Sequence, residues 1–192
     1  MLDAPRVAVV GTRKPTVEGA ARTRRLVGEL VGRGVVVVSG LAEGVDTLAH
    51  VTAIERGGKT VAVLGTPLNE VYPAANRDLQ ESLARDHLII SQFPSGWPVQ
   101  RKNFPLRNRT MALIADASVI VEAGDGSGTL SQGWEALRLG RPLFFLRSLL
   151  DVPNLRWPRE MIEYGAAILE SVEPLLDVLP AHRARDERHV AL

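Results

Sequence analysis

Short apolar runs alternate with helical patterns along most of the chain. The runs are rich in β-branched residues and lack apolar–polar alternation, which is typical of strands covered on both faces in a parallel sheet. They lie at Val7–Val10, Val35–Val38, Val61–Leu64, Leu88–Ile90, Ser118–Val121 and Leu143–Leu146. Helical patterns lie between them at 17–33, 46–56, 76–85, 107–115 and 130–139. This order predicts an α/β fold with a doubly wound, mostly parallel, extended Rossmann-like sheet and helices on both faces.

The alternation weakens after Leu150. We expect residues 1–150 to form the Rossmann-like core and residues 151–180 to extend the same domain. Residues 181–192 are mostly charged, and we expect a flexible tail there. An earlier interruption, Gln92–Pro105, contains three prolines and predicts a long loop of the kind that is often functional.

Composition narrows the chemistry. The 192 residues fit one domain and include no cysteine, which excludes disulfides, thiolate metal sites and cysteine nucleophiles. No apolar run approaches the roughly 20 residues that span a bilayer, and the first residues lack a secretory pattern, so we expect a cytoplasmic protein. Three of the 23 basic residues are lysine, which leaves 20 arginines, the side chain that forks onto phosphate oxygens. We expect no metal and no cofactor.

Three glycine-bearing turns each follow an apolar run. Parallel strands would bring these turns to one edge of the sheet, where open α/β sheets bind ligands. Glycine lets a ligand approach the backbone, and the free N–H groups at the following helix starts attract anions. The turns therefore predict a phosphate-bearing ligand. The candidate residues are Gly11, Thr12, Arg13, Lys14, Ser39, Gly40, Leu41, Gly126, Ser127, Gly128 and Thr129. Asp46 is available to cap the helix that follows the second turn.

The helix expected at 107–115 adds further candidates. Arg107, Asn108 and Arg109 lie at its start, and Pro105 favours a helix start nearby. The two arginines are about 200° apart around a helix, so one at most faces a given ligand unless the helix begins between them. Phe104 or Trp97 could stack on a base, as single-strand binders require, although packing beneath the long loop explains them equally well.

Taken together, the motifs resemble the DNA-processing protein DprA (Smf) family, within the Rossmann-like SLOG superfamily. The resemblance rests on ordered motifs across about residues 5–180, with Val9–Thr16, Val38–Asp46, Ala62–Thr66, Val71–Pro73, Gln92–Pro94, Asn103–Arg109 and Val121–Ala123 among them. It implies a homodimer that binds single-stranded DNA in a basic pocket and assists a RecA-type recombinase in natural transformation or DNA recombination. It also implies that Arg13, Arg107 and Arg109 meet phosphates, with Gly40 and Gly128 shaping the pocket.

Two other functions remain open at this stage. The same pocket could hold a mononucleotide as a sensor without chemistry. The Gly-x-Gly-Thr turn is also similar to that of the LOG-type phosphoribohydrolases, which cleave nucleoside monophosphates. Those enzymes carry a glutamate three residues after the threonine, whereas this chain has Gln132, which cannot exchange a proton. The sequence therefore favours a binding protein over an enzyme.

Overall fold

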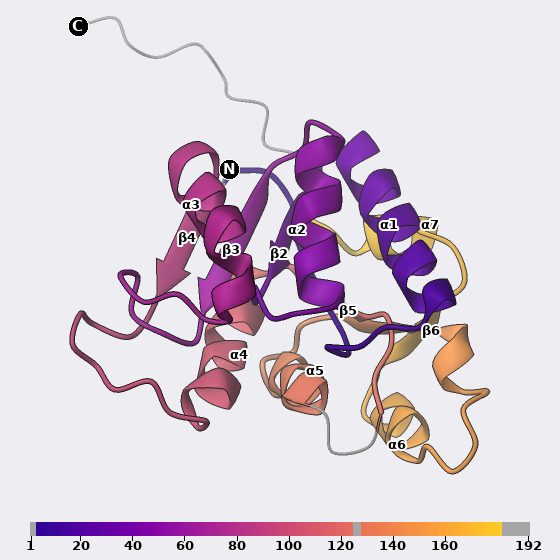
Figure 1. Ribbon diagram of the computed structural model, residues 1–192. Helices are drawn as coiled ribbons and strands as arrows, with labels where there is room; N and C mark the ends of the chain where they lie inside the picture. The colour runs from indigo at the N-terminus through magenta and orange to yellow at the C-terminus, as the bar shows by residue number, and fades with distance from the viewer. Residues whose placement is uncertain (1–2, 125–127, 182–192) are drawn as a thin grey trace, which may run out of the picture.

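One seven-stranded sheet organises the molecule. The computed structural model describes residues 3–124 and 128–181, and all six strand pairs within these ranges are parallel. The strands are β1 (Arg6–Val10), β2 (Val36–Ser39), β3 (Thr60–Leu64), β4 (Leu88–Ser91), β5 (Ala117–Ile120), β6 (Leu143–Leu146) and β7 (Ala167–Leu169). Their spatial order is β4-β3-β2-β1-β5-β6-β7, so the direction of winding reverses between β1 and β5 (Figure 1).

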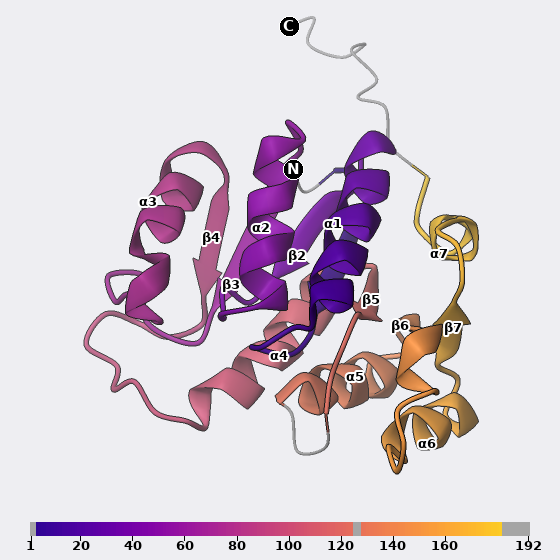
Figure 2. The same cartoon turned by 45° about the vertical axis from the view of Figure 1, so that its right-hand side comes forward.

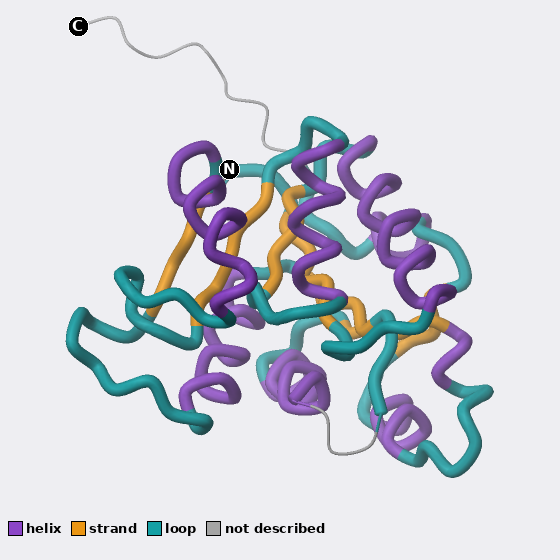
Figure 3. Tube along the Cα trace, in the orientation of Figure 1, coloured by secondary structure: helices purple, strands orange, loops and turns teal. Residues whose placement is uncertain are grey.

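Helices cover both faces of this sheet. They are α1 (Val17–Gly32), α2 (Val45–Glu55), α3 (Arg77–Asp86), α4 (Asn103–Ile114), α5 (Gly128–Arg138), α6 (Trp157–Glu163) and α7 (Glu173–Asp177), with short 3-10 turns η1 (Ala74–Asn76) and η2 (Arg147–Leu149). Figure 3 shows the strands as a layer between helices, and Figure 2 shows α1 and α2 on the side opposite α4 and α5. The predicted doubly wound α/β fold is confirmed.

Two apolar cores explain why the strand sequences are continuously hydrophobic. Val7 and Val9 of β1 face α1, α2 and α7, whereas Ala8 and Val10 face α4, α5 and α6. Because successive side chains of a strand point to opposite faces, a strand buried on both sides needs apolar residues at every position. All five residues of β3 are buried for the same reason.

The helix α4 begins at Asn103, four residues earlier than the predicted start at Arg107. Pro105 therefore lies within the first turn, where its missing N–H leaves no helical bond unmade. This start places both Arg107 and Arg109 inside the helix. The loop before α4 is correspondingly shorter than the sequence indicated.

The segment after Leu150 contributes to the same sheet through β7, which pairs with β6. Trp157 and Met161 of α6 pack into one core and Leu175 of α7 into the other. The boundary at residue 150 stays a prediction, and residues 182–192 of the predicted tail lie outside the described residues. Within the described ranges, no helix is long and apolar enough to cross a membrane, and no cluster of three potential metal ligands occurs.

Candidate functional site

The glycine-bearing turns meet where the winding reverses, at the carboxyl ends of β1, β2 and β5. The Val45 N–H at the start of α2 donates to the Thr12 carbonyl over 3.1 Å. The Thr129 hydroxyl of α5 donates to the Gly11 carbonyl, also over 3.1 Å. Gly44 completes the junction with a φ of +79°, and a Cβ there would lie 2.4 Å from the Thr12 oxygen. This is the edge at which open α/β sheets bind ligands.

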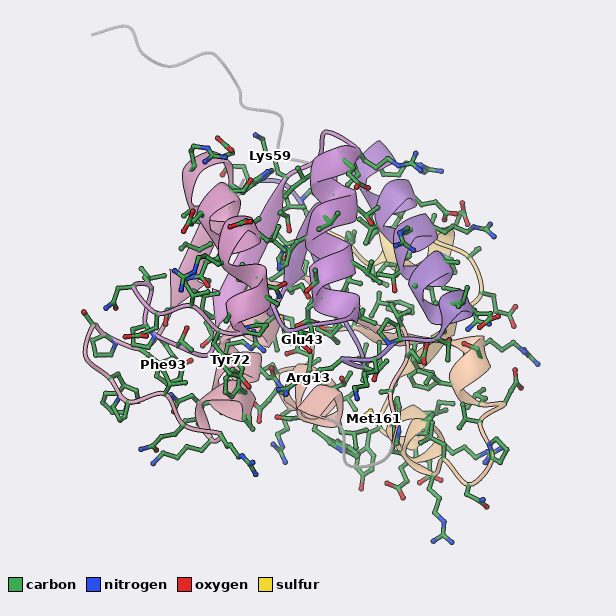
Figure 4. The ribbon with its side chains drawn as sticks, in the orientation of Figure 1. Arg13, Glu43, Lys59, Tyr72, Phe93 and Met161 are labelled. Atoms are coloured by element: carbon green, nitrogen blue, oxygen red, sulfur yellow. The ribbon has the colours of Figure 1, made fainter. Side chains whose placement is uncertain are left out.

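Two adjoining cavities open at this edge. The larger, about 450 Å³, is lined by Val10, Gly11, Thr12, Arg13, Lys14, Ala42, Asp46, Phe104, Pro105, Arg107, Asn108, Met111, Gly124, Gly128, Thr129 and Gln132. The smaller, about 150 Å³, is lined by Arg13, Gly40, Ala42, Glu43, Gly65, Tyr72, Pro73 and Phe104. Arg13, Ala42 and Phe104 line both. Figure 4 shows Arg13, Glu43 and Tyr72 together at this end of the strands, with Lys59 at the opposite end.

Positive side chains dominate the larger cavity. Arg13 and Lys14 are exposed at the end of β1, and Arg107 lies buried on α4. Among the described residues of its lining, one carboxylate, that of the buried Asp46, opposes these three cations. In the smaller cavity Arg13 is balanced by the exposed Glu43. An anionic group is therefore favoured at the Arg13–Lys14 rim of the larger cavity.

The Arg107 guanidinium donates hydrogen bonds to other groups of the protein. It is 5% exposed, and its Nη1 group donates to the carbonyls of Gly40 and Val63. Its Nε group donates to the Asn108 side chain over 3.2 Å. A Cβ at Gly40 would lie 2.1 Å from the Arg107 Nη1 atom, so the second turn needs glycine to let the guanidinium approach. Its predicted contact with phosphate stays a prediction, and its observed bonds fix the second turn against α4.

Asp46 is the electrostatic partner of Arg107. Its carboxylate accepts from the Ala42 N–H over 3.3 Å, which holds the second turn. The predicted capping of α2 by Asp46 is wrong, because the helix begins at Val45 with no side-chain cap and Asp46 turns back to the loop. Burial raises the pKa of Asp46, although the Arg107 charge opposes the shift. Burial likewise lowers the pKa of Arg107.

The two aromatic candidates, Phe104 and Trp97, lie in different parts of the structure. The half-buried Phe104 ring lies between the two cavities, and its centroid is 5.1 Å from that of Tyr72. Trp97 is 46% exposed on the loop before α4, beside Phe93 at 6.4 Å, and lines neither cavity. Of the two predicted stacking rings, Phe104 therefore lies at the site and Trp97 does not, and stacking on a base stays a prediction.

Glu122, just after β5, occupies the amino end of α1. Its carboxylate accepts from the Thr16 hydroxyl over 2.9 Å and from the Thr16 N–H over 3.2 and 3.3 Å. Its carbonyl also accepts from the Thr12 N–H over 2.6 Å. A helix start of this kind commonly binds phosphate in Rossmann-like proteins. Here the protein supplies the anion itself, so this helix start is closed to a ligand phosphate, and phosphate binding by Arg13 and Lys14 stays a prediction.

The remaining predicted residues lie around this arrangement. Ser39 is buried and donates to the Val9 carbonyl, and Leu41 packs in the core with a φ of +60°. Arg109 is 64% exposed and lies 4.0 Å from Glu135, outside both cavity linings. Gly126 and Ser127 fall outside the described residues. As phosphate ligands these five stay predictions.

Sequence reasoning missed several cavity residues. Tyr72, Pro105 and Met111 were not proposed as site residues, although the first two belong to motifs of the family resemblance. Asn108 was proposed, and it bonds the Gly128 carbonyl over 3.0 Å, which links α4 to α5. The apolar Met111 carried no signal, because its spacing on α4 is that of an ordinary core residue.

Beneath the second turn, His50 of α2 is fully buried and gives a pH-dependence prediction. Thr60 donates its hydroxyl proton to the Val37 carbonyl, so the His50 Nδ1 atom, 2.7 Å from that hydroxyl, is the donor of a neutral ring. Burial, followed by the charges of Arg107 and His87, lowers the pKa of His50 to about 3. The unfolded chain therefore takes up a proton below about pH 6.5, whereas the folded protein does not until about pH 3.

Stability is accordingly lost as the pH falls through this window. Between about pH 6.5 and pH 4.5, wild type should lose roughly 2 kcal/mol more unfolding free energy than His50→Asn. Urea denaturation at a series of pH values measures this difference. Parallel pH profiles for the two proteins would contradict it.

The fold and the site together define a Rossmann-like protein with a cation-rimmed cavity at its topological switch point. Residues 1–180 match the family model described as DNA recombination-mediator protein A, and the chain belongs to that family.

Curated relatives and solved structures agree with this family assignment. Protein Smf from Synechocystis is 40% identical over 177 residues, which cover 92% of this chain and 44% of that protein. The X-ray structure of DprA from Streptococcus pneumoniae has a TM-score of 0.84 at 35% identity and covers 94% of this chain and 64% of that one. Helicobacter pylori DprA, whose structure concerns its single-stranded DNA binding mode, has a TM-score of 0.79 at 31% identity and coverages of 92% and 80%. The chain spans 44–62% of the length of three curated relatives.

Proposed function

We propose that this chain binds single-stranded DNA along the two adjoining cavities, with Arg13 and Lys14 on the phosphates and Phe104 stacking on a base. The observation that carries the proposal is the position of Phe104 between two cavities that also share Arg13. Sequence-tolerant strand binders combine cations along the backbone with aromatic rings beneath the bases. The single-stranded DNA binding mode of the Helicobacter pylori relative supports the same assignment.

We infer a binding role without catalysis. Gln132 cannot act as an acid or base. Of the two carboxylates that would have to replace the missing glutamate, Glu122 is engaged by Thr16, and Asp125 lies outside the described residues. The homodimer, the RecA-type recombinase partner and the cytoplasmic location stay predictions from the sequence.

A mononucleotide is the second candidate ligand, because a cavity of about 450 Å³ lies within the range that small-molecule sites occupy.

Binding of a labelled oligodeoxycytidine of about 16 nucleotides, a typical upper site size for one domain, tests the proposal when it is followed by anisotropy across a salt series. The logarithm of the association constant should fall with the logarithm of salt concentration with a slope of roughly −1.4 or steeper, since each of two phosphates contributes about −0.7. AMP, as competitor, should bind more weakly. Tight AMP binding without oligonucleotide binding would favour the sensor, and release of adenine from AMP would favour the enzyme.

A further inference from the structure

A buried hydrogen-bond acceptor in the larger cavity has no partner. Gln132 of α5 is 1% exposed and lines that cavity, and its Nε2 group donates to the Ser118 hydroxyl over 3.2 Å. Its Oε1 atom has no hydrogen-bond partner among the residues that the structure describes. Leaving a buried acceptor unpaired is costly, so folded proteins rarely do so without a reason. A donor from a bound ligand would satisfy it.

Two buried side-chain donors of this cavity, Arg107 and Asn108, make hydrogen bonds within the protein. Arg107 gives Nη1 to the Gly40 and Val63 carbonyls and Nε to Asn108, and Asn108 gives its amide to Gly128. The Asp46 carboxylate already accepts from the Ala42 N–H, so the Gln132 oxygen is the buried acceptor of this lining that is left unpaired. A ligand N–H group that reaches the Gln132 oxygen therefore finds an acceptor with no competing partner among the described residues.

The layout of the cavity matches one nucleotide. Arg13 and Lys14 lie exposed at the rim, where a phosphate would be, and the acceptors Gln132 and Asp46 are buried. Val10, Met111 and the Phe104 ring supply apolar wall between them. Proteins that take a base out of a strand read its edge by hydrogen bonds inside an apolar pocket of this kind.

We propose that the larger cavity receives one base of the bound strand and that Gln132 Oε1 accepts a hydrogen bond from the exocyclic amino group of that base. Cytosine and adenine carry this group, whereas thymine and uracil carry a carbonyl oxygen at the corresponding position. The protein therefore prefers amino-bearing bases. The inference rests on the proposed strand binding. It adds a preference for certain bases, because contacts to phosphates alone do not depend on sequence.

Oligodeoxycytidine and oligodeoxyuridine of equal length test the preference, because both are unmethylated pyrimidines that differ at the base edge. Wild type should bind the cytidine strand roughly fivefold more tightly, the value of about one net hydrogen bond. If both strands bind equally, with a normal salt dependence, the base inference is overturned while strand binding stands. A preference for uridine would also overturn it, since the Gln132 oxygen would then accept from the ring N3–H of uracil and not from an amino group. If neither strand binds, the proposed function itself falls.

Variants assign the preference to Gln132. Gln132→Met removes the acceptor at similar volume, so the ratio of the two affinities should fall to about one. Gln80→Met is the matched control, because Gln80 is also buried with an unpaired Oε1 atom but lies outside both cavities. The control should keep the wild-type ratio. An undiminished cytidine preference in a folded Gln132→Met protein would overturn the role of Gln132, and the wild-type ratio remains informative if that variant fails to fold.

Discussion

Arg107→Met is expected to lower the free energy of unfolding by about 3–5 kcal/mol, since it leaves a buried carboxylate without its counter-charge. Arg107 is 5% exposed and provides the opposite charge to Asp46, which is equally buried. The variant also leaves the Gly40 and Val63 carbonyls without the hydrogen bonds that they accept from the guanidinium in the wild type. Urea denaturation measures the loss, provided that the slope of the unfolding free energy against urea concentration is the same for the variant and the wild type.

The pH dependence of this loss identifies its cause. Burial already raises the pKa of Asp46, and removal of the Arg107 charge raises it further. Protonation of Asp46 then relieves the unpaired charge, so the deficit of the variant should shrink as the pH is lowered.

Arg109→Met is the control for Arg107→Met on the same helix. Arg109 is 64% exposed and pairs with Glu135 only at 4.0 Å, so its loss should change stability by no more than about 0.5 kcal/mol. A cost below about 1 kcal/mol for Arg107→Met would contradict the structural role given to the buried pair.

The double variant Arg13→Ala/Lys14→Ala should lose most of its affinity for an oligonucleotide at low salt. Both side chains are exposed at the rim of the larger cavity, and neither is held in an ion pair among the described residues. Removing two phosphate contacts should make the salt slope shallower by roughly 1.4. Anisotropy titrations across a salt series measure both changes.

Arg56→Ala/Lys59→Ala provides the matched control for the rim variant. It removes one arginine and one lysine, both exposed, from the segment before β3 at the opposite end of the strands (Figure 4). Its salt slope should equal that of wild type. Equal slopes for all three proteins would mean that the strand does not cross the predicted edge.

The sequence was sufficient for six of the seven strands and for the meeting of the turns, but the segment that forms β7, Ala167–Leu169, was not predicted as a strand. Continuous apolar runs such as Val61–Leu64 identify strands buried on both sides, because alternate residues must satisfy two separate cores. The start of α4 was harder to place. The four residues at 103–106, Asn-Phe-Pro-Leu, show no helical periodicity, and only the tertiary contacts of Asn103 and Phe104 reveal that the helix has begun.

The two arginines of α4 show where prediction from sequence ends. Their spacing indicated that they would point in different directions, and the structure confirms that Arg107 faces inward while Arg109 faces Glu135. Nothing in the local sequence shows which one is buried, since the Gly40 and Val63 carbonyls that receive Arg107 come from the turn after β2 and from β3. Long-range partners of this kind emerge only when the chain is folded.

Because Glu122 already fills the amino end of α1, an incoming phosphate cannot use the N–H groups of that helix start as a backbone cradle. Under the proposed strand binding, each phosphate at the rim would meet exposed side chains, Arg13 and Lys14, whose attraction is screened by salt. Retention of the strand would then depend on the number of phosphates offered more than on the strength of any single contact. Such a strand could leave the protein one contact at a time, without a costly release step.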